Sequence, residues 1–148
     1  MSGRSRPLFA IGSAGLALGG VLHLFGQFGG PQPSLGRAAV EAGMRATTIT
    51  ALGMTMSLMD VMQAWGLSFG ALAIFCGLQN LLVLTLLPRG TGVLGLSATS
   101  ALASGFLVCV GIHYHAAPPI VVFGAVFLCF AAATMTAALS GAGGGSSS

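Results

Sequence analysis

Charged side chains are almost absent from long parts of this chain, and this limits the folds open to it more than any other feature. The 148 residues include five arginines, no lysine, one glutamate and one aspartate, so that 5% of the residues are charged. After Arg89 there is none at all. A soluble domain carries about 25% charged residues to cover its water-facing surface. With 55% hydrophobic residues, the sequence predicts an integral membrane protein.

Four apolar stretches are long enough to cross a bilayer as helices, which takes about 20 residues each. They cover residues 8–27, 64–87, 93–113 and 119–139. We therefore expect an all-α, polytopic membrane protein with four transmembrane helices. It would form a single domain over residues 1–140, followed by a flexible glycine–serine tail at residues 141–148.

The connection between the first two spans is predicted to be a periplasmic loop that contains an interfacial helix. Gly29–Pro33 has the glycines and prolines of a turn. Ser34 is placed to cap a short helix that ends at Arg45. Residues 46–63 hold no proline and little turn chemistry, so we expect more helix there, in or above the interface. Trp65 then fits the aromatic belt at the membrane boundary.

The arginines favour one orientation of the four spans. Arg4, Arg6 and Arg89 share one side in this topology, and Arg37 and Arg45 lie on the other. Positive charge favours the cytoplasmic side. We therefore expect an inner-membrane protein with both termini in the cytoplasm.

Small residues form one stripe along the first span. Gly12, Gly15, Gly19, His23 and Gly26 recur at spacings of three and four, which places them on one helical face. Such a stripe lets a second helix approach closely, within the chain or in a homodimer. His23 should therefore face a protein neighbour, either as a structural hydrogen bonder or as a functional group.

Asp60 has two interpretations. Ser57 and Asp60 have the S-x-x-D spacing of a capping box before an apolar run, which predicts a helix start. Alternatively, the Asp60 carboxylate pairs with His23, and the two act as acid and base on a lipid-like substrate. Both readings remain open at this point.

A methionine run and a histidine pair raise the question of metal binding. The run extends from Met54 to Met62, and thioether sulfur atoms are soft ligands that select Cu(I). Met56 and Met59, together with His113 and His115, are the candidate ligands. Methionine is also an ordinary filler of apolar space, and an H-x-H sequence binds one metal only in extended chain.

The remaining polar residues gather near one membrane boundary in this topology. Gln63, Trp65, His113, Tyr114 and His115 would all lie near the outer face, and they are the candidate ligand-binding residues. Histidine and tyrosine are also at home at a wet helix end.

Several function classes are disfavoured. Five scattered arginines are too few for a nucleic-acid footprint. A C-x-x-C pair, H-E-x-x-H and G-x-S-x-G are missing. The sequence also identifies no cofactor.

Three short motifs resemble a group of small, uncharacterised bacterial four-helix membrane proteins. They are "HLFG" late in the first span, "SLMD" before the second and "APPIVVFG" at the start of the fourth. The resemblance implies the four-helix fold and brings no activity with it.

The leading hypothesis is a small membrane protein that binds a partner protein or a lipophilic ligand at its outer face. The partners expected are the lipid bilayer and another membrane protein or a second copy. A membrane-embedded enzyme and a copper protein are the alternatives.

Overall fold

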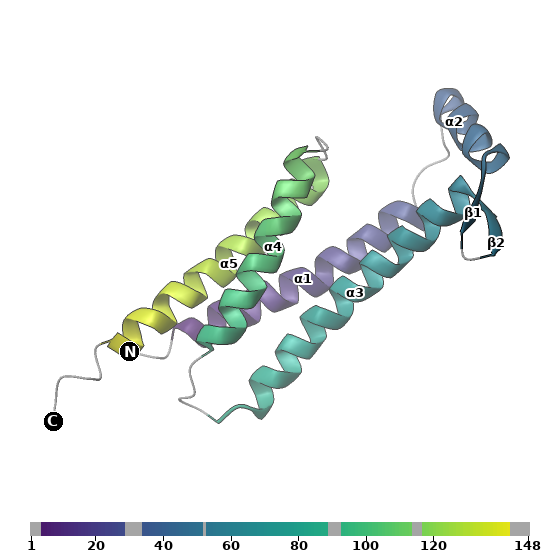
Figure 1. The fold of residues 1–148 in the computed structure, drawn as a ribbon. Coiled ribbons are helices and arrows are strands. Elements are labelled where there is room, and N and C mark those ends of the chain that lie inside the picture. The colour runs from purple at the N-terminus through teal and green to yellow at the C-terminus, as the bar shows by residue number, and fades with distance from the viewer. Residues whose placement is uncertain (1–3, 29–33, 52, 89–92, 114–116, 143–148) are drawn as a thin grey trace, which may run out of the picture. The chain divides into compact units, whose positions relative to one another are not determined.

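The computed structural model describes residues 4–28, 34–51, 53–88, 93–113 and 117–142. Its elements in chain order are α1 (Ser5–Phe28), α2 (Leu35–Ala46), β1 (Thr48–Ala51), β2 (Met54–Ser57), α3 (Leu58–Leu86), α4 (Leu94–His113) and α5 (Ala117–Ala142) (Figure 1). Tyr114, His115 and the tail beyond Ala142 lie outside the described residues, as does Arg89.

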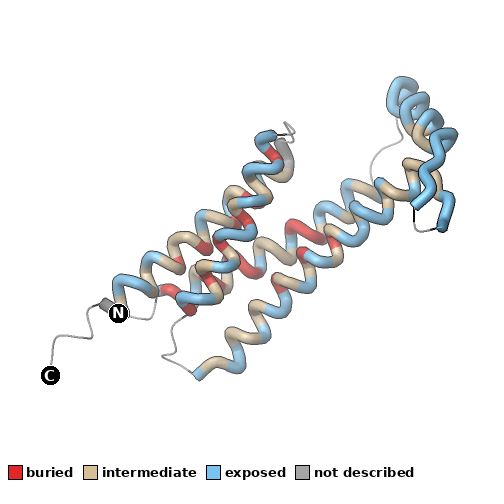
Figure 2. Tube along the Cα trace, viewed as in Figure 1, coloured by how far each residue is buried: buried red, intermediate tan, exposed pale blue. Residues whose placement is uncertain are grey.

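Four helices, α1, α3, α4 and α5, are long and apolar enough to cross a membrane. Only 17–28% of the residues in the most apolar part of each helix are buried within the protein, and Figure 2 shows exposed residues along all four. Leaving so much apolar surface in water is unfavourable by about 25 cal/mol per Å². The length and exposed apolar surface of these helices fit the membrane protein that the sequence predicts.

The chain divides into two compact units, which we describe separately. Unit 1 contains α1 up to Gly19, α3 from Ala73, and all of α4 and α5. Unit 2 runs from Gly20 to Leu72 and contains the end of α1, α2, the two strands and the start of α3.

The core of unit 1 is a cluster of apolar side chains that come from near the ends of its helices. Phe9 near the start of α1 and Phe130 in α5 are fully buried, with their ring centroids 5.5 Å apart. Val93 before α4 and Ala133 in α5 belong to the same cluster, and Leu87 after α3 packs against it. The start of α1, the end of α3, the start of α4 and the late part of α5 thus share one end of unit 1.

The glycine stripe of α1 is confirmed as a helix-packing face. Gly12 and Gly15 lie against Phe130 and Val126 of α5, and a methyl group at Gly19 would come within 2.7 Å of Val122. Glycine lets α5 approach α1 this closely because it has no side chain to displace. The stripe ends there, since nothing lies within 4 Å of a methyl group placed at Gly26.

Polar side chains inside unit 1 are satisfied by hydrogen bonds. The Asn80 amide of α3 donates to the Ser100 hydroxyl of α4 over 3.3 Å, so it joins these two helices. Ser13 and Ser97 are buried and donate to backbone carbonyls one turn earlier in their own helices. Among the residues that the structure describes, no buried side-chain nitrogen or oxygen is left without a partner.

A β-hairpin with strands at residues 48–51 and 54–57 replaces the middle of the helix expected over residues 46–63, so this prediction was wrong there, whereas residues 58–63 are helical. β1 and β2 pair antiparallel, with Ala51 opposite Met54, so the connection is two residues long. Gly53 in that turn has φ of 78°, a conformation that glycine adopts at little cost. The Thr50 and Thr55 hydroxyl oxygens lie 3.0 Å apart across the ladder. The helix was expected because the segment contains no proline. The threonines of the strands and the glycine in the turn favour a hairpin instead.

The other helix boundaries differ less from expectation. Because the hairpin ends at Ser57, α3 begins at Leu58, six residues before the predicted start at 64. α5 begins at Ala117 with both prolines in its first turn, where their missing N–H groups have no helical partner to lose. It also extends to Ala142, two residues into the predicted tail.

Candidate functional site

The end of α1 and the start of α3 pack closely within unit 2. Gly70 lies against Leu24, and a methyl group placed on it would come within 3.3 Å of the Gly20 carbonyl oxygen. Gly66 lies against the Gln27 amide. Small residues on α3 thus leave space for larger side chains of α1. We call this contact the α1–α3 seam; its members are Gly20, His23, Leu24 and Gln27 of α1, and Gln63, Gly66, Phe69 and Gly70 of α3.

Gln27 and Gln63 form the polar part of the seam. The Gln27 Nε2 donates to the backbone carbonyl of Gln63 over 3.3 Å, and both residues are half-buried. Gln63 was predicted to bind a ligand, and the structure places it in contact with α1. The sequence patterns do not single out Gln27, although its spacing of four from His23 puts both on one helical face.

His23 belongs to the seam through its ring. The imidazole meets the Phe69 ring edge-on, with centroids 5.2 Å apart. The residue is nevertheless exposed overall, so Phe69 covers only part of it. Phe69 follows Trp65 by one helical turn, or about 6 Å along α3. His23 therefore contacts α3 one turn after Trp65.

Asp60 caps α3. Its backbone N–H donates to the Ser57 hydroxyl oxygen over 3.1 Å. In return, the Ser57 N–H and hydroxyl donate to the Asp60 carboxylate over 3.2 and 2.7 Å. This reciprocal pattern confirms the capping box, which satisfies backbone groups that a helix start leaves unpaired.

The structure does not bring His23 and Asp60 into contact. His23 meets α3 at Phe69, nine residues after Asp60. Nine residues of helix span about 13 Å, which is too far for two groups to share one proton directly. The hydrogen bonds described for the Asp60 carboxylate both come from Ser57.

The proposed metal ligands come from different parts of the chain. Met56 lies in β2 and Met59 lies in the first turn of α3, and both are half-buried. His113 is the last residue of α4, in unit 1. Among the described residues, no three His, Cys, Asp or Glu side chains are grouped as a metal site would need.

Trp65 presents an exposed aromatic surface beside the seam. Its exposed fraction is 75%, and Phe25 and Phe28 near the end of α1 are exposed as well. Exposed aromatic rings of this kind are typical of membrane–water boundaries, where an amphipathic ring meets both phases. The structure thus leaves most of Trp65, predicted to bind a ligand, uncovered.

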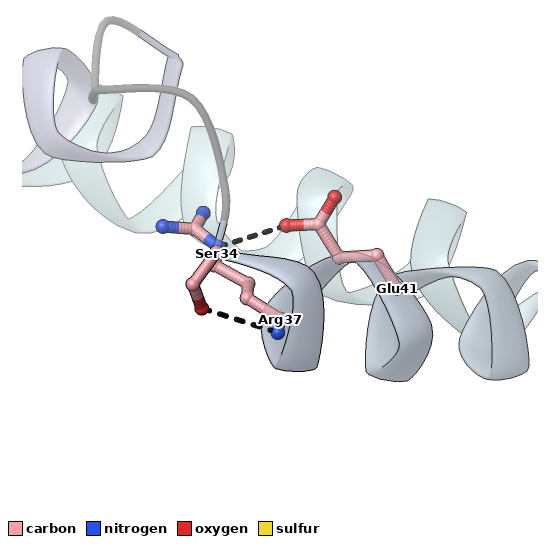
Figure 3. A network of polar contacts seen from close by, with 3 residues as sticks. All are labelled: Ser34, Arg37 and Glu41. Carbon is pink, nitrogen blue, oxygen red and sulfur yellow. Dashed lines mark hydrogen bonds and ion pairs between the residues drawn. The ribbon is translucent and has the colours of Figure 1, made fainter.

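α2 carries a small polar network on its surface. Ser34 caps the helix as predicted, because its hydroxyl oxygen accepts from the Arg37 backbone N–H over 3.4 Å (Figure 3). The Arg37 guanidinium in turn forms an ion pair with Glu41, with Nε and Oε1 2.9 Å apart. An exposed pair of this kind contributes about 0.3–0.5 kcal/mol. The ion pair therefore adds little to the stability of α2, but it holds the Arg37 and Glu41 side chains next to each other.

The chain matches no family model, no curated protein and no solved structure. The candidate site therefore depends on geometry alone. That geometry places His23 away from Asp60 and leaves Trp65, the hairpin strand β1 and most of α2 exposed within unit 2.

Proposed function

We propose that this chain is a multi-pass inner-membrane protein, with both termini in the cytoplasm, that binds a partner membrane protein at its outer face. The outer face is the end of unit 2 made by α2, the hairpin and the first turn of α3. The distribution of the arginines supports this orientation. The binding proposal is based on the exposed edge of the hairpin.

This exposed edge belongs to β1. All four of its residues are exposed, and within the described part of the chain the sheet has only two strands. The edge contains no proline and no charge. Natural proteins usually protect an edge strand with such residues, or cover it, because unpaired backbone groups recruit another strand.

The register tells which backbone groups point outward. In a hairpin with a two-residue connection, Ala51 and Met54 exchange hydrogen bonds, and the pairs then alternate. The Leu58 N–H donates to the Thr47 carbonyl over 2.8 Å, in step with this alternation. The N–H groups of Thr48 and Thr50 therefore point away from β2, toward any strand that is added.

A partner strand would also stabilise the hairpin itself. Isolated two-stranded hairpins are marginal in water, and they need a third strand or a packing surface to persist. These strands are four residues long, and neither has a fully buried residue. Strand addition to a free edge is a known mode of protein recognition, in which main-chain hydrogen bonds supply affinity.

Thr50→Pro tests the proposal, with Thr50→Val as its matched control. Both variants remove the hydroxyl that meets Thr55, but only proline removes the outward N–H. We expect co-purification of the partner from mild-detergent extracts to fall about tenfold for Thr50→Pro, equivalent to about 1.4 kcal/mol. Thr50→Val should recover the partner as the natural chain does.

Two further measurements make the result decisive. Equal thermal stability of Thr50→Pro and Thr50→Val would show that the proline has not unfolded the hairpin. Ile49→Pro removes a hydrogen bond between the two strands, so it shows the effect of an unfolded hairpin on partner recovery. A photo-reactive residue at Thr48 should cross-link to a protein. Equal recovery of the partner with both Thr50 variants, or cross-links to lipid alone, would contradict the proposal.

A further inference from the structure

The surface of α2 is divided into an apolar and a charged face. At 100° per residue, Leu35, Gly36, Ala39, Gly43 and Ala46 fall within about 100° of one another. The three charged residues, Arg37, Glu41 and Arg45, occupy the opposite side. We call the first set the apolar face of α2.

Among the residues that the structure describes, none buries the apolar face. α2 has no buried residue, and Leu35, at its start, is 93% exposed. The hairpin contacts α2 through β2. An amphipathic helix without a protein neighbour on its apolar face is typical of helices that lie in a membrane boundary.

Both ends of α2 are tied to helices that are able to cross a membrane. At its N-terminal end, residues 29–34 connect it to α1, a distance of at most about 25 Å. At its C-terminal end, the Thr47 carbonyl accepts from the N–H of Leu58, the first residue of α3. In Figure 1, α2 runs across the direction of α1 and α3 within unit 2. A bilayer crossed by those two helices would therefore meet α2 along its length.

The charges around α2 cancel. Residues 20–72 contain Arg37 and Arg45 against Glu41 and Asp60. Arg37 is paired with Glu41. Arg45 interacts electrostatically with the Asp60 carboxylate. Attraction to anionic headgroups requires an excess of positive charge, and this segment has none.

We infer that α2 lies in the headgroup–acyl boundary of the bilayer, with its apolar face toward the lipid chains, and that it is held there without anionic lipid. The occupant of the apolar face is the membrane itself, and not a second protein. Tethering at both ends makes a modest apolar face sufficient, because the helix never leaves the surface. The inference requires only that α1 and α3 cross the membrane, so it is independent of the partner proposed for β1.

Spin labels placed one at a time on α2 of the full-length protein test this inference. Cys76, Cys109 and Cys129 are first replaced by alanine, and single cysteines are then introduced at Ala39 and Ala38. Ala39 lies on the apolar face, and Ala38 is a matched alanine about 100° away on the charged side. Both changes leave every charged residue of α2 in place.

We expect the Ala39 label to collide several-fold more with oxygen, relative to a water-soluble nickel complex, than the Ala38 label does. The difference should be the same in zwitterionic bilayers, in bilayers with added anionic phospholipid, and at high salt. Equal ratios at the two positions would overturn the inference. So would a dependence on anionic lipid, exclusion of both reagents at Ala39, or spin–spin coupling between labels of two chains.

Discussion

Arg6 shows how one side chain can have a role that its sequence position does not reveal. By its place before the first apolar run, it was expected to set the orientation of the chain. In the structure its guanidinium donates to the carbonyl oxygens of Leu84, Leu87 and Pro88, over 2.7, 3.2 and 2.9 Å. The Leu84 carbonyl lies in the last turn of α3 and the other two directly follow that helix, which has no basic residue in its own last turn. Arg6 thus caps a helix more than 70 residues away in the chain.

Replacing Arg6 with glutamine should lower the free energy of unfolding by about 1–2 kcal/mol, because hydrogen bonds from a charged donor to the end of α3 are lost. Thermal unfolding in mild detergent measures this. Arg4→Gln is the control, since Arg4 is exposed and has the same charge. Equal loss of stability in both variants would mean that charge at the N-terminus matters and the cap does not.

At the scale of the elements, glycines decide how closely the helices of unit 1 approach one another. Gly77 of α3 faces the α1 backbone, where an added methyl group would lie 2.6 Å from both the Ser13 carbonyl oxygen and the Ala17 nitrogen. Backbone atoms cannot rotate away as the end of a side chain can. Gly95 of α4 has nothing within 4 Å of the same added group.

Gly77→Ala should therefore destabilise unit 1 by about 1–3 kcal/mol, as overpacking does. Gly95→Ala should be neutral or stabilise by up to about 1 kcal/mol, because alanine is the better helix former. The comparison is made by thermal unfolding of the two variants in the same detergent. If Gly77→Ala unfolds no earlier than Gly95→Ala, the close approach of α1 and α3 is not as described.

At the scale of the whole molecule, the directions of the helices in unit 1 predict on which side of the membrane the two termini lie. Phe9 of α1 and Ala133 of α5 belong to one cluster, so the start of α1 and the late part of α5 lie at the same end. Four crossings by the four candidate spans would give the same result, since an even number returns the chain to its starting side. Both termini should therefore be in one compartment.

Reporter fusions at the two ends test this directly. An enzyme active only in the cytoplasm should be active when fused before α1 and when fused after α5. A reporter inserted at Gly36, within the connection between α1 and α3, should be inactive there. Activity at one terminus only would remove one of the four crossings, and activity at Gly36 alone would reverse the orientation.

The sequence predicted the helices well where a single physical property is sufficient. Apolar runs uninterrupted by charge define α1, α4 and α5 to within a few residues, because charged side chains are costly in the hydrocarbon region of a bilayer. Local capping signals were equally informative. Ser34 and Ser57 cap the helices that follow them, since a cap needs only neighbours three residues away.

The hairpin and the seam were less accessible. The strands of the hairpin are four residues long, too short for periodicity to distinguish strand from helix in an apolar setting. The seam joins Gln27 to Gln63, 36 residues later, and no local pattern encodes that meeting. The sequence suggested a pairing of Asp60 with His23 because both are titratable, whereas His23 meets α3 at Phe69, about 13 Å along that helix from Asp60.

The sequence by itself determined that this protein has four helices fit for a membrane, because the cost of placing charge in lipid is a property of composition. It also determined where most of those helices begin and end. Only the tertiary structure decided what the polar residues with distant partners do: Arg6 caps α3, and Gln27 joins α1 to α3. The reason is physical. Burial in lipid depends on the residue alone, whereas a hydrogen bond depends on which distant group the fold brings within about 3 Å.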